Sequence, residues 1–450
     1  MSILSLDFAL LIFFSAALYL FLPPRRRWMF LLCLSALILA AINWKAFGIA
    51  AVQTTAAYVM GLWLSKSRSL LLFWFCVLAQ LSVLLTFKLM GMSKVDLSFE
   101  SARWLVPLGL SFYTFQILAY FIEVRWGRIP AERNFGKFST YILFFANKVA
   151  GPIERPGLLR ALDSIPTPSS ENVLKSAFLI WMGLFQKFVI ADHLADFVRP
   201  VFARPEAYAG LPVTISVLLS KYQIFCDFSG ISLIAVGLGG LFGLQLTHNF
   251  NRPFAATTLR EFWTRWHISL QSWIRDYVFF PLLSTPIGRR GVFFALVISF
   301  LVFALWHDFL WTFAVYGLVQ AVLVKTEPLR FLRRFPTIVL IVLNYSILIC
   351  LPSVLFRVDS LSQAFDIWRN MGFSTLNMKF FASLGSSAMA LAVFIVLNEV
   401  WQWLESRKDV YAYLAKQPWV LKMAVCAVLL VILVLFSKFD PESVFIYSRF

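Results

Sequence analysis

Charged residues are scarce in this chain of 450 residues. Only 14% of the residues are charged, whereas 60% are hydrophobic. A soluble chain of this length is far more polar, so the composition excludes an ordinary soluble protein. The short, alternating segments of an outer-membrane barrel are missing as well. We therefore expect an all-α, polytopic integral membrane protein with about 11 transmembrane helices.

Paired cysteines, clustered metal ligands and a cleavable leader are also missing. The five cysteines are scattered singly through apolar segments without a CxxC pair, and we interpret them as reduced packing residues. The four histidines show neither HxxxH nor HxxEH spacing, so we expect no metal site. The N-terminus lacks a basic region and a small-residue cleavage site, which predicts a retained first span.

Acidic residues are few, and the net charge is +17. In a soluble protein this charge would suggest a nucleic-acid partner. Here the basic residues cluster between apolar segments, where they orient the spans of a membrane protein. We therefore exclude nucleic acid and expect the lipid bilayer as the partner. Basic loops such as Arg25–Arg27 alternate with less basic connections, which predicts an N-terminus outside the cytoplasm.

Apolar segments alternate with short polar connections along the whole chain. Segments 138–152 and 211–243 are too short or too polar to cross alone, and we interpret them as re-entrant or broken helices. The two halves show no repeat, and no soluble domain can be detached. We expect a single membrane domain over residues 1–450, with a polar core at about 222–325. The candidate spans lie near 6–22, 28–44, 46–64, 69–90, 104–122, 138–152, 173–191, 211–243, 291–324, 337–355, 380–403 and 420–437.

His307 lies in the middle of the apolar stretch 291–325. Basic residues flank the stretch at 289–290 and from Lys325 onward, so both ends are expected in the cytoplasm and the chain must enter and return. Each limb has only about 16 residues, or roughly 24 Å of helix against a hydrocarbon core of roughly 30 Å. The turn of His307 and Asp308 is therefore predicted to stop short of the far surface. An ionisable group in such a place is costly and is expected to be functional.

Asp227 stands in the segment Cys226-Asp227-Phe228-Ser229-Gly230, with apolar residues on both sides. In these surroundings its carboxyl group must be paired, solvated or protonated. One interpretation makes Asp227 or Ser229 the N-cap of the following helix. The other makes Asp227 an orienting residue of a functional site. Both interpretations stay open, and they can coexist.

A polar loop, His248–Phe254, is followed by a Thr258-x-x-Glu261 spacing that predicts a helix from about Leu259. We interpret His248 as structural. The helix carries two polar stripes, so it either lies in the interface, anchored by tryptophans, or lines a wet passage through the protein. His267 is then either a hydrogen-bonded core residue or a site residue. The apolar stripe comprises Trp266, Leu270, Trp273 or Ile274, and Tyr277; the polar ones comprise Arg265, Ser269, Ser272 and Asp276, and His267, Gln271 and Arg275.

These pieces occur in an order that resembles the membrane-bound O-acyltransferase family, in its bacterial alginate O-acetylation branch. The teichoic-acid D-alanylation protein is a more distant relative. The resemblance covers nearly the whole chain. Its motifs are Pro107-LGLSFYTFQILAYFIEV, Ala150-GPIERP, Gln186-KFVIAD, Asp227-FSG, Asn249-FNRPF, Glu261-FWTRWHISLQSWIRDYVFFPL, Leu305-WHDFLWTFAVYG, Leu355-FRVDSLSQAFDIWRNM and Val444-FIYSRF.

The resemblance implies helices around a central tunnel, through which an acyl group passes from a cytoplasmic thioester to a hydroxyl. The LWHG histidine of the family matches His307, and the histidine of its RWHISL motif matches His267. The resemblance also implies a bacterial cytoplasmic (inner) membrane protein without a bound cofactor. Its donor would be acetyl-CoA or an acyl carrier protein. A periplasmic acetyltransferase partner would pass the acetyl group to an exported polysaccharide; direct transfer to a lipid-linked or small-molecule hydroxyl is the alternative.

The chain departs from the family pattern at several positions. DFSGYSDMA reads DFSGISLIA here, so that Ile231 and Leu233 replace a tyrosine and an aspartate. LWHG becomes LWHD with Asp308, PLGG becomes Pro281-Leu-Leu-Ser284, and a downstream histidine becomes Gln320. His307 is kept, so transferase chemistry is still expected. The acceptor and the partner protein are what these changes leave open.

Transfer from a thioester to a hydroxyl needs a base and a group that stabilises the oxyanion. We expect a neutral His307 to act as the base and His267 to assist it. Trp306 and Trp311 would wall the site against water. The candidate orienting residues are Asp227, Asn249, Arg265, Asp276 and Asp308. A transporter or flippase, and a non-catalytic scaffold, are the alternative hypotheses, and neither requires His307 for catalysis.

Overall fold

The computed structural model describes residues 6–67, 69–92, 107–148, 151–286, 291–373, 378–407 and 410–438. The ordered elements in these ranges are all helical, with two isolated β-bridges. Within these described ranges, seven helices are long and apolar enough to cross a membrane, and three shorter ones are apolar. The all-α, polytopic membrane fold is therefore confirmed. Arg289, Arg290, Ala150 and the terminal motif at 444–450 lie outside the described residues.

The chain groups into two compact units, each described here by itself. The first comprises Met1–Phe178 and Ala235–Thr247, and the second comprises Leu179–Ile234 and His248–Phe450. This grouping does not test the predicted single membrane domain, which stays a prediction.

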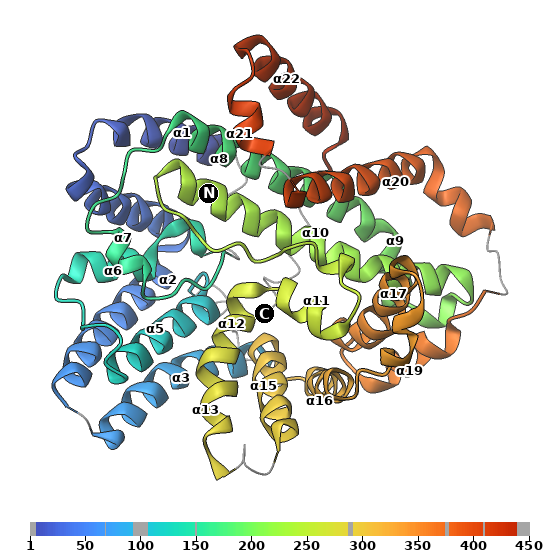
Figure 1. Ribbon diagram of the computed structural model, residues 1–450, viewed down its shortest axis with the longest axis horizontal. Helices are drawn as coiled ribbons and strands as arrows, with labels where there is room; N and C mark the ends of the chain where they lie inside the picture. The colour runs from blue at the N-terminus through green and yellow to red at the C-terminus, as the bar shows by residue number, and fades with distance from the viewer. Residues whose placement is uncertain are drawn as a thin grey trace. The chain divides into compact units, whose positions relative to one another are not determined.

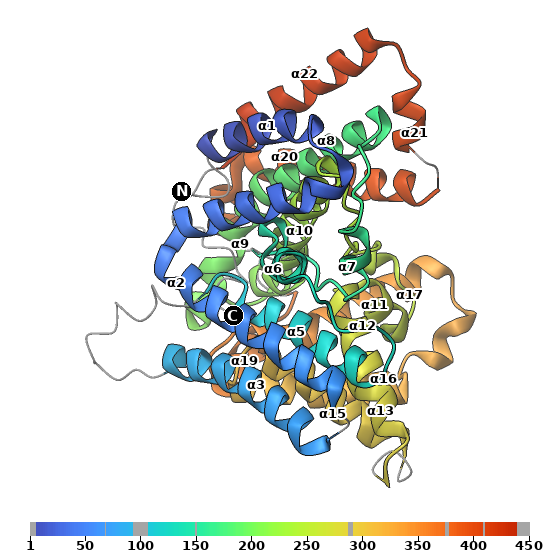
Figure 2. The same ribbon diagram turned by 90° about the vertical axis from the view of Figure 1, so that its left-hand side faces the viewer.

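The first unit is built from long helices held together by buried polar side chains. Tyr113 donates to Gln53 Oε1 at 2.9 Å, and Gln53 Nε2 donates to Gln80 Oε1 at 2.9 Å, so the side chains tie three helices together. Figure 2 shows these helices, α2, α3 and α5, beside one another. The elements are α1 (Leu6–Leu20), η1 (Pro24–Arg26), α2 (Arg27–Lys66), α3 (Leu70–Met92), α5 (Leu110–Arg125), α6 (Phe135–Leu143), η2 (Phe145–Asn147), α7 (Leu158–Ala161) and the start of α8 (Ser170–Leu184).

The predicted spans 28–44 and 46–64 form one helix, α2, with a kink between them. Asn43 has non-helical backbone angles (φ −159°, ψ 100°). Its side-chain oxygen accepts from the Ala46 N–H at 3.0 Å, so it caps the second half of the helix. The expected break near Lys45 is thus a kink within a helix and not a loop.

The second unit contains the polar core predicted from the sequence. In Figure 1 its helical hairpin, α15 and α16, appears as two adjacent helices. Its elements are η3 (Phe185–Ala191), α9 (Asp192–Ala203), η4 (Pro205–Ala207), α10 (Leu211–Leu241, to Ile234), η5 (Pro253–Ala255), α11 (Leu259–Arg265), α12 (Ile268–Ile274), η6 (Arg275–Phe279), α13 (Phe280–Leu283), α15 (Val292–His307), α16 (Trp311–Thr326), η7 (Arg330–Arg334), α17 (Thr337–Leu343), η8 (Asn344–Cys350), α18 (Leu351–Ser353), η9 (Val354–Phe356), α19 (Leu361–Asn370), α20 (Met378–Arg407), α21 (Val410–Ala415) and α22 (Trp419–Phe436).

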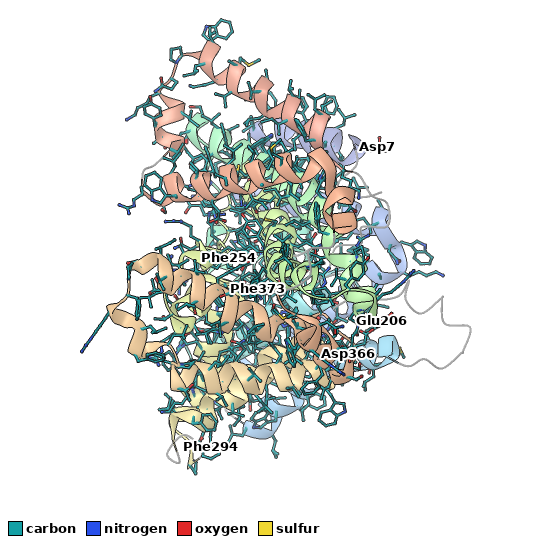
Figure 3. All side chains as sticks on the ribbon, turned by 90° about the vertical axis from the view of Figure 1, so that its right-hand side faces the viewer. Asp7, Glu206, Phe254, Phe294, Asp366 and Phe373 are labelled. Atoms are coloured by element: carbon teal, nitrogen blue, oxygen red, sulfur yellow. The ribbon has the colours of Figure 1, made fainter. Side chains whose placement is uncertain are left out.

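The hairpin confirms the predicted entry and return of the chain at His307. The first limb ends at His307, and the second begins at Trp311. A Cβ atom on Gly317 would lie 2.7 Å from the Phe300 carbonyl oxygen, so the two helices cross too closely for any side chain at that position. Figure 3 labels Phe294 at the outer end of the first limb, where its side chain is 50% exposed. His307, at the turn, is completely buried.

The interpretation of 211–243 as a broken or re-entrant helix is wrong. Residues 211–241 form the continuous helix α10. The polar residue in its middle, Asp227, is neutralised by an ion pair with Lys187, so the backbone does not need to open toward water. Segment 138–152 is indeed too short to span, because α6 ends at Leu143 and a 3₁₀ turn follows.

The predicted helix begins at Leu259 as expected, but it does not continue. The Thr258 hydroxyl accepts from the Glu261 N–H at 3.1 Å and caps α11. The helix ends at Arg265, and a left-handed residue, His267 (φ 47°, ψ 53°), precedes α12. The assignment of one helix with three continuous stripes is therefore wrong, because the break at His267 changes the register of every following side chain.

Candidate active site

His307 presents a defined tautomer at the end of α15. Its Nδ1 lies 2.8 Å from the carbonyl oxygen of Phe303, one helical turn earlier. A carbonyl oxygen can only accept, so Nδ1 of the neutral ring carries the proton and Nε2 carries the lone pair. The backbone of the hairpin therefore selects Nε2 as the basic nitrogen.

Aromatic rings surround His307. The ring centroids of Phe303, Trp306 and Phe356 lie 4.7, 4.8 and 5.0 Å from the centroid of the imidazole. Trp306 is 6% exposed and forms the wall predicted from the sequence. The same expectation for Trp311 is wrong, because its side chain is 82% exposed. Trp311 comes after the turn, at the first position of α16, and points away from the imidazole pocket.

His267 lies beside His307. The two ring centroids are 6.3 Å apart, and the centroid of Trp306 is 6.0 Å from that of His267. Both histidines are completely buried. The structure thus brings together three of the predicted site residues, although 39 positions along the chain separate the first two.

The His267 ring has no hydrogen-bond partner on either nitrogen among the described residues. Burial lowers the pKa of this histidine to about 3, so the ring is neutral at physiological pH, with one N–H donor and one lone pair. A buried polar group without partners is costly. The interpretation of His267 as a hydrogen-bonded core residue is therefore wrong, and the ring can accept or donate to a ligand.

Asn249 holds the two residues that follow His267. Its backbone carbonyl accepts from the Ile268 N–H at 2.9 Å. Its side-chain Oδ1 accepts from the Ser269 hydroxyl at 2.6 Å and from the Ser269 N–H at 3.3 Å. Its Nδ2 donates to the Ser232 hydroxyl at 3.1 Å. Asn249 is thus placed to support the turn of His267.

Asp227 lies in an ion cluster, in the interior of α10. The Lys187 Nζ is 2.7 Å from Asp227 Oδ1 and 2.8 Å from Asp192 Oδ1, and all three side chains are at most 4% exposed. The interpretation of Asp227 as an N-cap is wrong, because the helix begins 16 residues earlier, at Leu211. Its role in orienting a substrate stays a prediction. Its neighbour Phe228 does reach the site, with its ring 4.6 Å from that of His267.

The other three predicted orienting residues make local contacts. Arg265 forms an ion pair with Glu261. Asp276 accepts from Arg275 Nε at 2.8 Å. Asp308 leaves the helix with extended angles, and its Oδ1 accepts from the Phe309 N–H at 2.7 Å. Their roles toward a substrate stay predictions.

Two cavities lie next to the turn of His267, and Ile268 lines both of them. The first, of about 310 Å³, is lined by both polar and apolar side chains, and we call it the polar cavity after the polar ones. The second, of about 260 Å³, has mainly apolar walls that include Phe303, and we call it the aromatic cavity. The polar cavity is lined among others by Gln186, Ser229, His248, Asn251, Arg252 and Gln402. Two cavities therefore lie beside this turn, whereas a continuous tunnel stays a prediction.

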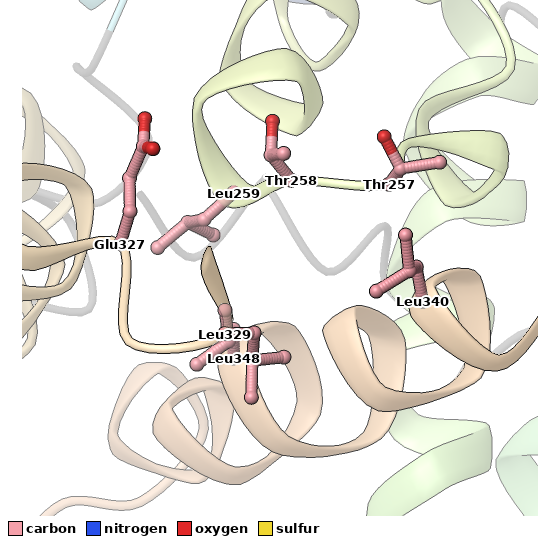
Figure 4. A pocket seen from close by; sticks show the side chains of 7 residues that line it. All are labelled: Thr257, Thr258, Leu259, Glu327, Leu329, Leu340 and Leu348. Carbon is pink, nitrogen blue, oxygen red and sulfur yellow. The ribbon is translucent and has the colours of Figure 1, made fainter. Parts of the chain in front are cut away.

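A third cavity, of about 340 Å³, lies at the start of α11. Figure 4 shows its oxygen atoms, on Thr257, Thr258 and Glu327, on one side and its leucine side chains on the other. Glu327 also forms an ion pair with Arg260 at 3.0 Å. Neither histidine lines this cavity, so we do not include it in the site.

Several site residues escaped the sequence analysis. Phe303 could have been found, because it precedes His307 by the four residues of one helical turn. Phe356, Ser232 and Lys187 come from distant segments, and their contacts with the predicted residues leave no local signal. Within the described ranges, no group of three or more histidine, cysteine, aspartate or glutamate residues is arranged to hold a metal ion.

Comparison with known proteins shows the family to which the chain is similar. The sequence profile of the membrane-bound O-acyltransferase family matches residues 60–339. A probable alginate O-acetylase of Azotobacter vinelandii is 30% identical over 315 residues, which are 65% of this chain and 60% of the relative. A peptidoglycan O-acetyltransferase of Helicobacter pylori is 26% identical over 61% of this chain and 58% of the relative. A teichoic acid D-alanyltransferase of Streptococcus thermophilus is 31% identical over 48% of this chain and 55% of the relative. The matches thus span between half and three fifths of the length of these relatives.

Proposed function

This multi-pass membrane protein belongs to the membrane-bound O-acyltransferase family, and we propose that it transfers an acyl group from a thioester to a hydroxyl. The observation that carries the proposal is the buried pair of His307 and His267, with ring centroids 6.3 Å apart. The hydrogen bond from His307 Nδ1 to the Phe303 carbonyl supports a base at Nε2.

In the proposed reaction, His307 Nε2 takes the proton of the acceptor hydroxyl as its oxygen attacks the thioester carbonyl. A new C–O bond forms, and the C–S bond breaks. The thiolate leaves with the proton from the His307 imidazolium, so the products are an ester and a thiol. The rings around His307 keep water from the thioester, which limits wasteful hydrolysis.

His267 assists this reaction as a neutral ring. Because burial holds the pKa of His267 at about 3, it keeps one N–H donor near neutral pH. This N–H is suited to the oxygen that becomes negative during the attack, because a preformed donor in a dry site stabilises such a charge strongly.

We infer that the acyl group is acetyl and that the acceptor is an exported or cell-surface polymer. The similarity to an alginate O-acetylase and to a peptidoglycan O-acetyltransferase supports this substrate class. The donor would be acetyl-CoA or an acyl carrier protein on the cytoplasmic side of the bacterial inner membrane. A periplasmic acetyltransferase would receive the acetyl group and pass it to the polymer.

The test measures alkali-released acetate from surface glycan in a deletion strain that carries the wild-type gene, His307→Ala or His193→Ala, at equal protein levels. His193 serves as the control because it lies on α9, outside the site. We expect His307→Ala to lower the ester formed by about 10²-fold or more. Wild type and His193→Ala should restore it.

Full restoration by His307→Ala would refute the acyltransferase proposal and favour a transporter or scaffold. The absence of any ester difference between the deletion strain and wild type would exclude a surface polymer as the acceptor.

A further inference from the structure

The turn of His267 is strained, and the ring cannot hold itself in place. A residue other than glycine with φ 47° is in the left-handed region, which side chains with a Cβ atom disfavour. The ring nitrogens have no hydrogen-bond partner among the described residues. The orientation of the imidazole must therefore come from the backbone of the turn and from the side chains packed against it.

One stripe of side chains on α10 packs against His267 and against two residues that support its turn, Trp266 and Asn249. The stripe consists of Lys221, Phe225, Phe228 and Ser232, which follow one another at intervals of four, three and four residues. This spacing puts them on one face of an α-helix. All four are buried. The stripe keeps its register because α10 is continuous from Leu211 to Leu241.

At one end of the stripe, Ser232 supports Asn249. The Asn249 Nδ2 donates to the Ser232 hydroxyl at 3.1 Å, and this bond fixes the amide so that Oδ1 faces Ser269. The Ile268 N–H donates to the Asn249 carbonyl at 2.9 Å. The C-terminal side of the His267 turn is thus attached to α10 through two residues.

At the other end of the stripe, Lys221 supports Trp266, the residue before His267. The Lys221 Nζ lies 4.0 Å from the centroid of the Trp266 ring. Phe225 packs against the same indole, with centroids 6.2 Å apart. Trp266 also forms a β-bridge with Phe250. The Lys221 amino group and the Phe225 ring thus pack on the Trp266 indole, so the N-terminal side of the turn is held as well.

We propose that this stripe of α10 holds His267 in its strained, left-handed turn, and that Ser232 and Lys221 are positioning residues for the imidazole. Between the two ends, Phe228 packs against the imidazole itself, with ring centroids 4.6 Å apart. The proposal rests on the proposed function where it concerns catalysis, and on the observed contacts alone where it concerns the turn.

The strain is tested without any activity measurement, by comparing His267→Gly with His267→Ala in the purified, full-length protein. Both variants lack the ring, and they differ only in the Cβ atom. We expect the glycine variant to unfold at a temperature about 1–2 °C higher, because glycine adopts positive φ freely. An equal or higher unfolding temperature for the alanine variant would refute the strain.

Positioning is tested with two pairs of variants, each with a conservative partner. Ser232→Ala removes the hydroxyl and Ser232→Thr keeps it. Lys221→Met removes the terminal amino group, and Lys221→Arg keeps N–H groups at the end of the side chain. We expect Ser232→Ala and Lys221→Met to lower kcat about tenfold or more with KM within about twofold, because a misplaced catalytic group slows the chemical step. Ser232→Thr and Lys221→Arg should recover most of kcat.

Modification of His267 by diethyl pyrocarbonate, followed by mass spectrometry, supplies a readout that does not depend on turnover. We expect faster modification in Ser232→Ala and Lys221→Met than in wild type, at an unchanged unfolding temperature. Unchanged kcat and unchanged modification would refute the positioning roles. A fall in kcat that merely follows a fall in unfolding temperature would also refute them. If wild type transfers no acyl group, the proposed function fails, and the modification rates still decide whether the stripe holds the turn.

Discussion

Lys187 forms a buried ion pair with Asp227, at 2.7 Å between Nζ and Oδ1, and joins the π-helical turn η3 to the middle of α10. The same ammonium binds Asp192 at 2.8 Å. One cation thus serves two carboxylates. Nearby, the carbonyl oxygen of Gly183 would collide with a Cβ atom on Gly230, so the two segments are in close backbone contact. The ion cluster permits this close contact inside an apolar unit.

This arrangement predicts unequal effects for the members of the cluster. Lys187→Met removes the cation that two buried carboxylates share, whereas Asp227→Asn leaves the pair of Lys187 and Asp192 intact. We expect Lys187→Met to cost about 3–5 kcal/mol of stability and Asp227→Asn clearly less. Thermal unfolding in detergent measures both, with Asp196→Asn as the control, since that aspartate pairs with Lys438 at the surface. Equal losses for Lys187→Met and Asp227→Asn would contradict the shared cation.

The close crossing of the hairpin predicts that Gly317→Ala is destabilising. The added Cβ atom would lie 2.7 Å from the Phe300 carbonyl oxygen, so the two limbs must separate. We expect a loss of about 1–3 kcal/mol and reduced acyl transfer, because His307 ends the first limb. Gly48→Ala is the matched control: it has no atom within 4 Å of the new Cβ and should be neutral or slightly stabilising. Similar unfolding temperatures for the two variants would disprove the close crossing.

The aromatic wall predicts that Trp306→Ala admits water to the thioester. The indole packs against both histidines, at 4.8 and 6.0 Å between centroids. We expect more thioester hydrolysis per acyl group transferred, because the site is no longer dry. Released thiol and ester product are measured together in the same reaction. Trp311→Ala is the control, since the Trp311 side chain is 82% exposed. Its ratio of released thiol to ester product should equal that of wild type. An unchanged ratio for Trp306→Ala would exclude the wall function.

Glu154 predicts a dependence of stability on pH. Its side chain is buried and accepts from the Thr247 N–H at 2.6 Å, and burial raises its pKa to about 7 from a model-compound value of 4.5. Between these values the folded protein binds more protons than the unfolded chain, so the free energy of unfolding falls as the pH rises through this window. We expect Glu154→Gln to be more stable than wild type at pH 8 and equally stable at pH 5.

The measurement for this prediction is the unfolding temperature at both pH values, with the exposed Glu171→Gln as the control. If Glu154→Gln were no more stable than wild type at pH 8, the buried carboxylate would not be the source of the pH dependence of stability.

Much of the architecture was predictable because it depends on local pattern. The apolar length and flanking basic residues indicated the hairpin of α15 and α16, and the turn falls at His307 as expected. The Thr258-x-x-Glu261 spacing indicated the start of α11 at the correct residue. The misassigned segments, 211–243 and the helix after Leu259, share one cause. Polar residues were interpreted there from sequence alone, without knowledge of the distant groups that pair with them.

By itself, the sequence determined a helical membrane protein with a buried histidine at the end of a short apolar hairpin. Hydrophobic length, caps and basic flanks act over a few residues, so these features can be read from neighbouring positions. Only the tertiary structure decided that Lys187 neutralises Asp227, that Trp311 faces away from the site, and that His267 lies in a left-handed turn against α10. Each of these depends on contacts between residues far apart in the chain, and the energy of such contacts outweighs local propensity.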